Sequence, residues 1–213
     1  MEKAKTMAWR LLAASVSLLT LSQLAHADSL DEQRSRYAQI KQAWDSRQMS
    51  VVEQLMPTLT TYPLYPYLQY RQITDDLMNQ PTLVVKNFIE ANPTLPPART
   101  LKSRFVNELA RRTDWSGLLA FSPEKPATTE AQCNYYYAKL SVGQAQEAWD
   151  GAKTLWLTGK SQPNACDALF SAWRDSGKQD PLAWLERIRL AMKAGNTALV
   201  SVLAQQMPPE YQT

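Results

Sequence analysis

Prolines and glycines divide this chain into short segments whose apolar residues repeat at helical spacing. Leu101, Phe105 and Leu109, for example, fall at i, i+4 and i+8 and share one face of a helix. The strongest break is 92–97, where three prolines in five residues cannot lie inside a helix. No segment shows the alternating, β-branched pattern of a strand. The sequence therefore predicts an all-α fold.

Helix ends are marked by residues with known capping roles. Ser29 and Glu32 have the spacing of a capping box, and Gly143 follows an apolar repeat as a C′ residue. Gly151 lies inside a helical pattern, where it costs about 1 kcal/mol relative to alanine. A glycine at such a position indicates close contact with another helix.

The segments pair as helix–turn–helix units, which predicts an irregular α-solenoid, or superhelix, of about ten helices. The run Gly-x-x-x-x-Ala-Trp at 143–149 is similar to a tetratricopeptide-type turn. In the helix that starts at Pro181, the predicted apolar face carries Leu185, Ile188 and Met192. Because the repeat length is irregular, a compact helical bundle is the alternative.

Residues 1–27 have the pattern of a signal peptide. Three basic residues precede a short apolar run at 11–21, and a small-x-small site ends at Ala27, before Asp28. The apolar run is shorter than the roughly 20 residues of a spanning helix. We expect cleavage between Ala27 and Asp28 and export of the protein; a retained N-terminal anchor is the alternative.

Removal of this segment changes the composition in two ways. The only histidine, His26, is lost, so histidine-dependent catalytic triads are excluded from the mature chain. The net charge falls from +3 to +1, since the segment carries three basic residues and one acidic residue. The small net positive charge that remains is therefore poor support for a nucleic-acid or anionic-membrane partner. No other apolar segment has the length to cross a membrane.

Two cysteines remain, Cys133 and Cys166. In an oxidising compartment an even count predicts a disulfide, worth roughly 3–4 kcal/mol in the chain-entropy estimate. Two buried free thiols are the alternative. Without histidine, two cysteines do not complete a usual zinc site, so we expect no metal.

The sequence singles out no catalytic constellation. It contains neither GxGxxG nor GxxxxGK[ST], so no nucleotide or other cofactor is predicted. Paired carboxylates occur as Asp75 with Asp76 and as Glu147 with Asp150, and on helices such pairs usually face solvent.

A basic group surrounds the helix that follows the proline-rich break. Its members are Lys102, Arg104, Arg111 and Arg112. We interpret this group as a solvated face; contact with an anionic polymer is the alternative.

The stretch 62–71 holds four tyrosines and two prolines. Its prolines favour a turn that feeds a helix beginning at Pro66. Tyr65, Tyr67 and Tyr70 then either wedge between helices, with their hydroxyls hydrogen-bonded, or present rings on which sugars could stack. We favour packing; a glycan-facing role for these three tyrosines is the alternative.

Four stretches together resemble the N-terminal part of the soluble lytic murein transglycosylase family. They are 28–37, 62–77, 92–99 and 162–166. The resemblance extends over the whole chain and implies a periplasmic protein whose residues 28–213 form an α-superhelical U-domain, a scaffold. It also implies that full-length members of the family carry a separate lysozyme-like catalytic domain at their C-terminal end.

In the family that catalytic domain cleaves the MurNAc–GlcNAc bond of peptidoglycan to 1,6-anhydromuramoyl products, and its essential acid is a glutamate followed by serine. This chain has no Glu-Ser dipeptide. We therefore expect a scaffold region, truncated at its C-terminal end and inactive alone, that meets glycan strands through a full-length enzyme.

Two other functions are possible from sequence. A free-standing periplasmic adaptor would bind a protein partner in a helical groove. A self-contained glycosidase would need a general acid in an apolar pocket, and the sequence singles out none.

Overall fold

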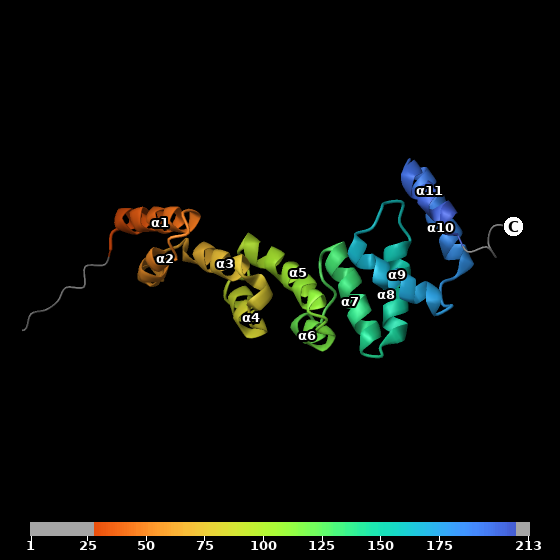
Figure 1. Ribbon diagram of the computed structural model, residues 1–213, viewed down its shortest axis with the longest axis horizontal. Helices are drawn as coiled ribbons and strands as arrows, with labels where there is room; N and C mark the ends of the chain where they lie inside the picture. Colours follow the sequence, from red (N-terminus) through yellow and green to blue (C-terminus); the bar gives the residue numbers. More distant parts are fainter. Residues whose placement is uncertain (1–27, 208–213) are drawn as a thin grey trace, which may run out of the picture. The chain divides into compact units, whose positions relative to one another are not determined.

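The structure, a computed structural model, describes residues 28–207. The expected signal peptide at 1–27 lies outside the described residues. The described part of the chain forms helices α1–α11 and three short 3-10 turns, η1–η3, without a strand (Figure 1). The prediction of an all-α fold is confirmed.

The chain divides into two units, residues 1–62 and 63–213. The described part of the first unit contains α1 (Leu30–Asp45), α2 (Met49–Leu55) and η1 (Met56–Leu59). At the start of α1, the Glu32 amide donates to Ser29 Oγ and the Ser29 amide donates to the Glu32 carboxylate, so the predicted capping box is present. The buried residues of this unit are Ile40, Ala43, Trp44, Val52, Met56, Leu59 and Tyr62.

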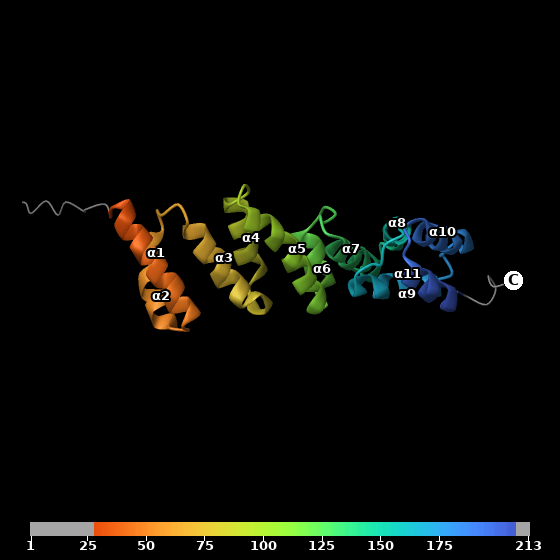
Figure 2. The same ribbon diagram turned by 90° about the horizontal axis from the view of Figure 1, so that it is seen from above.

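The second unit contains the remaining helices. They are α3 (Tyr65–Asp75), η2 (Leu77–Asn79), α4 (Thr82–Ala91), α5 (Pro96–Arg111), α6 (Trp115–Phe121), α7 (Thr129–Ser141), α8 (Ala145–Trp156), η3 (Asn164–Cys166), α9 (Asp167–Asp175), α10 (Pro181–Lys193) and α11 (Thr197–Gln205). Within this unit each helix packs mainly on helices next or next but one along the chain. Both views show this for α7, α8 and α9 (Figures 1 and 2). Such neighbour-to-neighbour packing is typical of the predicted α-solenoid, which is confirmed.

The proline-rich break differs in one respect from the prediction. Pro96 and Pro97 occupy the first turn of α5, with Leu95 as its N-cap, so two of the three prolines do lie in a helix. Amides of a first helical turn have no intrahelical acceptor, and proline therefore costs nothing there. Only Pro93 stays outside, in the connection between α4 and α5.

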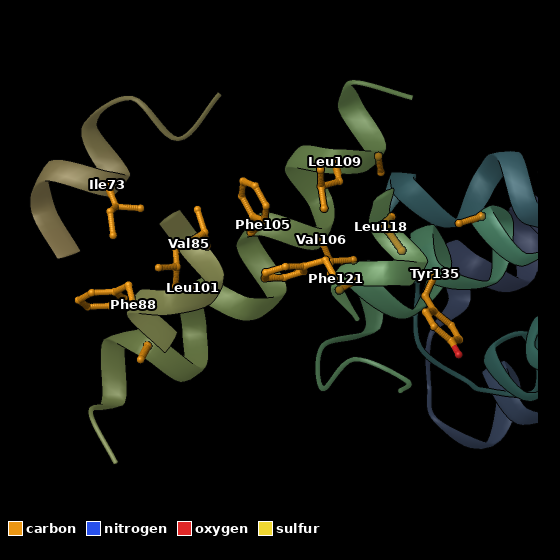
Figure 3. Packing of buried hydrophobic residues seen from close by; sticks show 14 residues of the cluster. Ile73, Val85, Phe88, Leu101, Phe105, Val106, Leu109, Leu118, Phe121 and Tyr135 are labelled. Atoms are coloured by element: carbon orange, nitrogen blue, oxygen red, sulfur yellow. The ribbon is translucent and has the colours of Figure 1, made fainter. Parts of the chain in front are cut away.

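A first apolar core in the second unit is built around α5. Leu101, Phe105 and Leu109 are each at most 1% exposed, as their spacing predicted. The Phe105 ring meets the Phe121 ring of α6 edge-on, with 4.9 Å between centroids. Figure 3 shows these side chains together with Leu118 of α6 and Tyr135 of α7, so one cluster joins successive helices.

A second core, from α7 to α11, is built around two tryptophans. The ring centroids of Trp156 and Trp184 are 4.9 Å apart. Both indole nitrogens donate to backbone carbonyls, Trp156 to Ala183 at 3.1 Å and Trp184 to Leu203 at 3.2 Å. The aromatic centre of this core is therefore satisfied in its hydrogen bonds as well as buried.

The predicted apolar face of α10 is wrong for two of its three residues. Leu185 and Met192 are 47% and 65% exposed, and only Ile188 is partly buried against the second core. The buried face carries Trp184 and Arg187. The helix has apolar residues on both sides, so periodicity alone does not choose between them. Burial of the large indole decides the orientation, and it draws Arg187 inward on the same face.

Candidate functional site

Of the three tyrosines singled out in the sequence, Tyr70 has the most contacts. Its ring lies 6.4 Å from the Phe88 ring of α4 and packs against the first core. Its hydroxyl accepts a hydrogen bond from Arg104 Nη1 at 2.8 Å. This is the wedge arrangement that we favoured for the stretch.

Tyr65 and Tyr67 lie in the first turn of the same helix, α3, with different exposure. Tyr65 is half-buried, and Tyr67 is 39% exposed. The geometry thus leaves Tyr67 as the ring with free surface. A glycan-facing role for any of the three tyrosines stays a prediction.

Cys133 of α7 and Cys166 of η3 form the predicted disulfide. Both residues are fully buried in the second core, with Cα atoms 4.8 Å apart. The bond joins two helical elements separated by 33 residues in sequence. It is a structural clamp rather than a reactive thiol site.

The carboxylate pairs are all at the surface. Asp76 accepts from Asn79, and Asp150 accepts from Gln146. Glu147 pairs with Lys139 at 3.1 Å, and this hydrogen bond raises the pKa of Lys139. Among the described residues these acids line no shared cleft, so the arrangement does not support acid–base catalysis.

The buried acid of the first core is Glu108, which sequence reasoning did not single out. Its side chain is 7% exposed and lies between Arg111 at 3.4 Å and Arg112 at 3.3 Å. Glu108 is therefore an ion-pair partner and not a candidate general acid.

The predicted solvated basic face is only partly correct. Arg104 and Arg111 are exposed, and Lys102 is half-buried. Arg112 is integrated into the fold: it donates to the carbonyls of Leu77 and Gln80, and its guanidinium lies 5.3 Å from the Phe105 ring. Arg112 makes these contacts because η2 packs against α5. Packing between such distant segments is not visible in the local sequence.

A groove of about 860 Å³ lies between α9, α10 and α11, and sequence reasoning did not find it. Its lining residues are Trp156, Ser161, Gln162, Asp167, Phe170, Ser171, Arg174, Arg187, Ala198, Leu199, Val202, Leu203, Gln206 and Met207. Arg187, on α10, is only 5% exposed. Burial lowers the pKa of Arg187 to about 10, so it remains a cation at neutral pH.

One spacing in the sequence indicates the buried face of α10 that lines this groove. Trp184, Arg187 and Ala191 follow at i, i+3 and i+7, the spacing of a single helix face. An arginine in that register breaks the apolar pattern, and the exposed side with Leu185 and Met192 then appears the more regular one.

Among residues 28–207, no group of three or more histidine, cysteine, aspartate or glutamate side chains could hold a metal ion. Nor is any helix in this range both long and apolar enough to cross a membrane.

Fold and site together define a class: an α-solenoid of paired helices, clamped by a disulfide, whose described residues assemble no catalytic constellation. No family model matches the chain. Over all 213 residues it is 80% identical to the soluble lytic murein transglycosylase of Escherichia coli K12. That match covers 100% of this chain and 33% of the relative, so the chain spans about a third of the relative's length.

Two solved structures are also similar to this chain. The crystal structure of the 70 kDa soluble lytic transglycosylase from Escherichia coli matches with a TM-score of 0.86 and 82% identity, over 87% of this chain and 30% of that chain. An inactive mutant of the lytic transglycosylase Slt from Pseudomonas aeruginosa matches with a TM-score of 0.75 and 35% identity, over 82% of this chain and 28% of that chain. The chain is homologous to the N-terminal part of the soluble lytic murein transglycosylase.

Proposed function

We propose that these residues form the N-terminal scaffold region of a periplasmic enzyme that cleaves peptidoglycan to 1,6-anhydromuramoyl products. The observation that carries the proposal is 80% identity along the whole chain to the N-terminal third of an enzyme with that substrate in its name. In this proposal the chemistry belongs to a lysozyme-like domain outside the matched third. Residues 28–213 provide a helical framework that shapes access of glycan strands to it.

The described side chains support a scaffold more than an independent catalyst. Glycoside cleavage needs a carboxylic acid whose pKa is raised by an apolar surrounding. The buried candidate, Glu108, instead lies between the side chains of Arg111 and Arg112 and not in an apolar surrounding. The helices α5 and α7 are joined by continuous apolar packing, as a rigid framework requires.

A chimera tests this function directly. These 213 residues would replace the matching N-terminal third of the Escherichia coli relative, and release of 1,6-anhydromuropeptides from purified peptidoglycan would be measured by chromatography. If the scaffold is equivalent, the chimera should keep the parent's rate to within about twofold. The 213-residue chain alone should release none.

One matched variant and two further outcomes complete the experiment. Leu101→Asp in the chimera places a charge at a fully buried position and should abolish soluble, active protein. A chimera that folds by circular dichroism yet cleaves nothing would contradict the scaffold function and favour the periplasmic adaptor. Cleavage by the isolated chain would show a self-contained glycosidase.

We also propose that residues 1–27 direct export and are removed between Ala27 and Asp28. The disulfide between Cys133 and Cys166 supports an oxidising compartment, because cytosolic thiols are kept reduced. N-terminal sequencing of the protein from a periplasmic extract should begin at Asp28. A sequence beginning at Met1 or Glu2 would contradict cleavage and favour a retained anchor.

A further inference from the structure

Two pairs of successive helices carry the same sequence patterns. The pattern Tyr-x-Gln-x-(Lys/Arg)-Gln-x-x-Asp fits residues 37–45 of α1 and again residues 67–75 of α3. A second pattern, Val-Val-x-(Gln/Asn)-(Leu/Phe), follows at 51–55 in α2 and at 84–88 in α4. The pairs α1–α2 and α3–α4 are therefore two copies of one helical repeat. Because η2 lengthens the connection in the second pair, the repeat has no constant period.

In the first copy, residues of both patterns line a groove of about 390 Å³ between α1 and α2. Gln39 and Gln42 come from α1, where their spacing places them on one face, and Val51, Gln54 and Leu55 come from α2. A volume of this size falls within the range of small-molecule sites, roughly 300–1,000 Å³. Three glutamines and two apolar side chains thus face the same space.

In the second copy, the residues at the same places in the patterns line another groove, between α3 and α4 and also of about 390 Å³. Gln69 and Gln72 come from α3, and Val84, Asn87 and Phe88 come from α4. Val84 is 43% exposed, whereas Phe88 is buried. The groove and its amides are therefore a property of the repeat and not of one helix pair.

The lining residues of both grooves are all uncharged. The groove amides without a hydrogen-bond partner among residues 28–207 are those of Gln39, Gln42, Gln54, Gln69, Gln72 and Asn87. The exposed position beside the last amide of each pattern differs between the copies, with Glu53 in one and Lys86 in the other. Exposed helix positions commonly carry charges, so solvation alone does not explain uncharged amides at the same places in both copies.

An uncharged groove lined with amides selects its ligand by hydrogen bonding. A carboxamide offers two N–H donors and one carbonyl acceptor and stays uncharged across the physiological pH range. Its natural complement is another amide, whose carbonyl accepts from one carboxamide and whose N–H donates to another. A charged ligand finds no counter-ion among the lining residues. The valine of each groove adds apolar surface, which suits the methyl group of an acetamide.

We propose that each of these two grooves binds the acetamido group of an N-acetylated amino sugar in a glycan strand. The carboxamides of the two helices donate to the acetamido carbonyl and accept from its N–H, and the methyl group lies on Val51 or Val84. The remaining groove amides bond to ring hydroxyls. The choice of a glycan rests on the proposed function, because the GlcNAc units of peptidoglycan are uncharged and carry this group.

The test uses the whole 213-residue chain, ¹⁵N-labelled at its glutamine and asparagine side chains, and two oligosaccharides. Tetra-N-acetylchitotetraose carries an acetamido group on every ring, and cellotetraose is the matched sugar with hydroxyls in their place. The acetylated sugar should shift the side-chain amide signals of Gln42 and Gln72 to saturation, with a Kd on the order of 1 mM for such open grooves. Cellotetraose should bind at least about tenfold more weakly, because it offers the groove amides no amide partner.

Three glutamate variants separate the grooves. Gln72→Glu keeps the side-chain shape at an exposed position but replaces the donor amide with a carboxylate oxygen. It should abolish the shift of Asn87 and leave that of Gln42. Gln42→Glu should abolish the shift of Gln54 and leave that of Gln72, so the intact groove shows in each case that the variant is folded. Gln144→Glu changes an exposed amide outside both grooves and should alter neither Kd.

Three results would overturn the proposal. Equal affinity for cellotetraose would show sugar binding without recognition of the acetamide. Tighter binding of a blocked trialanine peptide than of the acetylated sugar would show a site for peptide amides. Groove signals that do not shift with the acetylated sugar up to about 20 mM would show that neither groove binds it.

The chimera experiment keeps these failures apart from failure of the scaffold function. A chimera that releases 1,6-anhydromuropeptides while neither groove binds the acetylated sugar would contradict the two sites alone. A folded chimera that cleaves nothing while both grooves bind the sugar would contradict the scaffold function and support the sites.

Discussion

Gly151 of α8 lies so close to Tyr136 of α7 that a Cβ atom at position 151 would overlap the tyrosine ring. Among the described helices of the second unit, α7 and α8 pack on one another most extensively, and Gly151 is buried between them. An interior glycine had predicted a close helix contact, and the structure confirms it. Burial also raises the pKa of the Tyr136 hydroxyl, as expected for a ring held between helices.

Gly151→Ala should destabilise the protein even though alanine is the better helix former. The methyl group forces the Tyr136 ring to shift, at a cost of about 1–3 kcal/mol, against a helix-propensity gain of about 1 kcal/mol. Urea unfolding followed by circular dichroism would measure the change. In a Tyr136→Ala background the same substitution should become stabilising, because the overlap is gone. A stabilising effect in the wild-type background would contradict the close packing.

Loss of the disulfide should lower the free energy of unfolding by about 3–4 kcal/mol in the chain-entropy estimate. The bond closes a segment of 33 residues in the second core. Urea midpoints would be compared with and without dithiothreitol. The double variant Cys133→Ala, Cys166→Ala serves as the control, since reductant should not change its midpoint. A wild-type midpoint that reductant leaves unchanged would show that the bond contributes nothing.

Arg112 and Arg111 should differ in their contribution to stability. Both pair with Glu108, but Arg112 also donates to two carbonyls and has a 28% exposed side chain, against 61% for Arg111. Arg112→Ala should cost about 2–3 kcal/mol, because it leaves buried acceptors unpaired. Arg111→Ala should cost less than about 1 kcal/mol. Equal costs in thermal unfolding would show that Arg112 acts only as a surface charge.

Arg187→Met should raise the stability of the chain at pH 7 by about 1 kcal/mol. Burial lowers the pKa of Arg187 from its ordinary value to about 10. Folding therefore disfavours the charged form, and this penalty is present at neutral pH and fades as the pH rises above about 10. Arg189→Met, an exposed control, should change stability by less than about 0.5 kcal/mol. A clear loss of stability in Arg187→Met would show that packing on Trp156 outweighs the burial of charge.

Alanine substitutions of the three tyrosines of α3 should differ in their effect on stability according to how exposed each ring is. Tyr70→Ala should cost about 2–4 kcal/mol, because its ring packs on the first core, and Tyr65→Ala should also mainly lower thermal stability. Tyr67→Ala should be nearly neutral, since its ring is 39% exposed. Co-sedimentation with purified peptidoglycan should be unchanged in every variant that folds. Weaker binding by Tyr67→Ala at unchanged stability would favour sugar stacking instead.

Much of the helical order could be predicted from sequence because it depends on a few adjacent residues. The Ser29 capping box and the positive-φ Gly143 after α7 are both present as expected. The apolar face of α5 was also correct, since one side of that helix is clearly more apolar than the other. Two prolines at the start of the same helix were placed wrongly, because the first turn tolerates residues that an interior turn rejects.

An all-helical chain with its breaks, its caps and a pair of cysteines suited to a disulfide follows from the sequence alone. Three features depend on how distant helices pack: the face with Trp184 and Arg187 turns inward on α10, Arg112 donates to the Leu77 carbonyl of η2, and a groove forms beside α11. Caps and turns follow from interactions over three or four residues. Burial of a side chain depends on which distant helix packs against it. Because α10 has apolar residues on two faces, its sequence alone does not show which face packs against a neighbour.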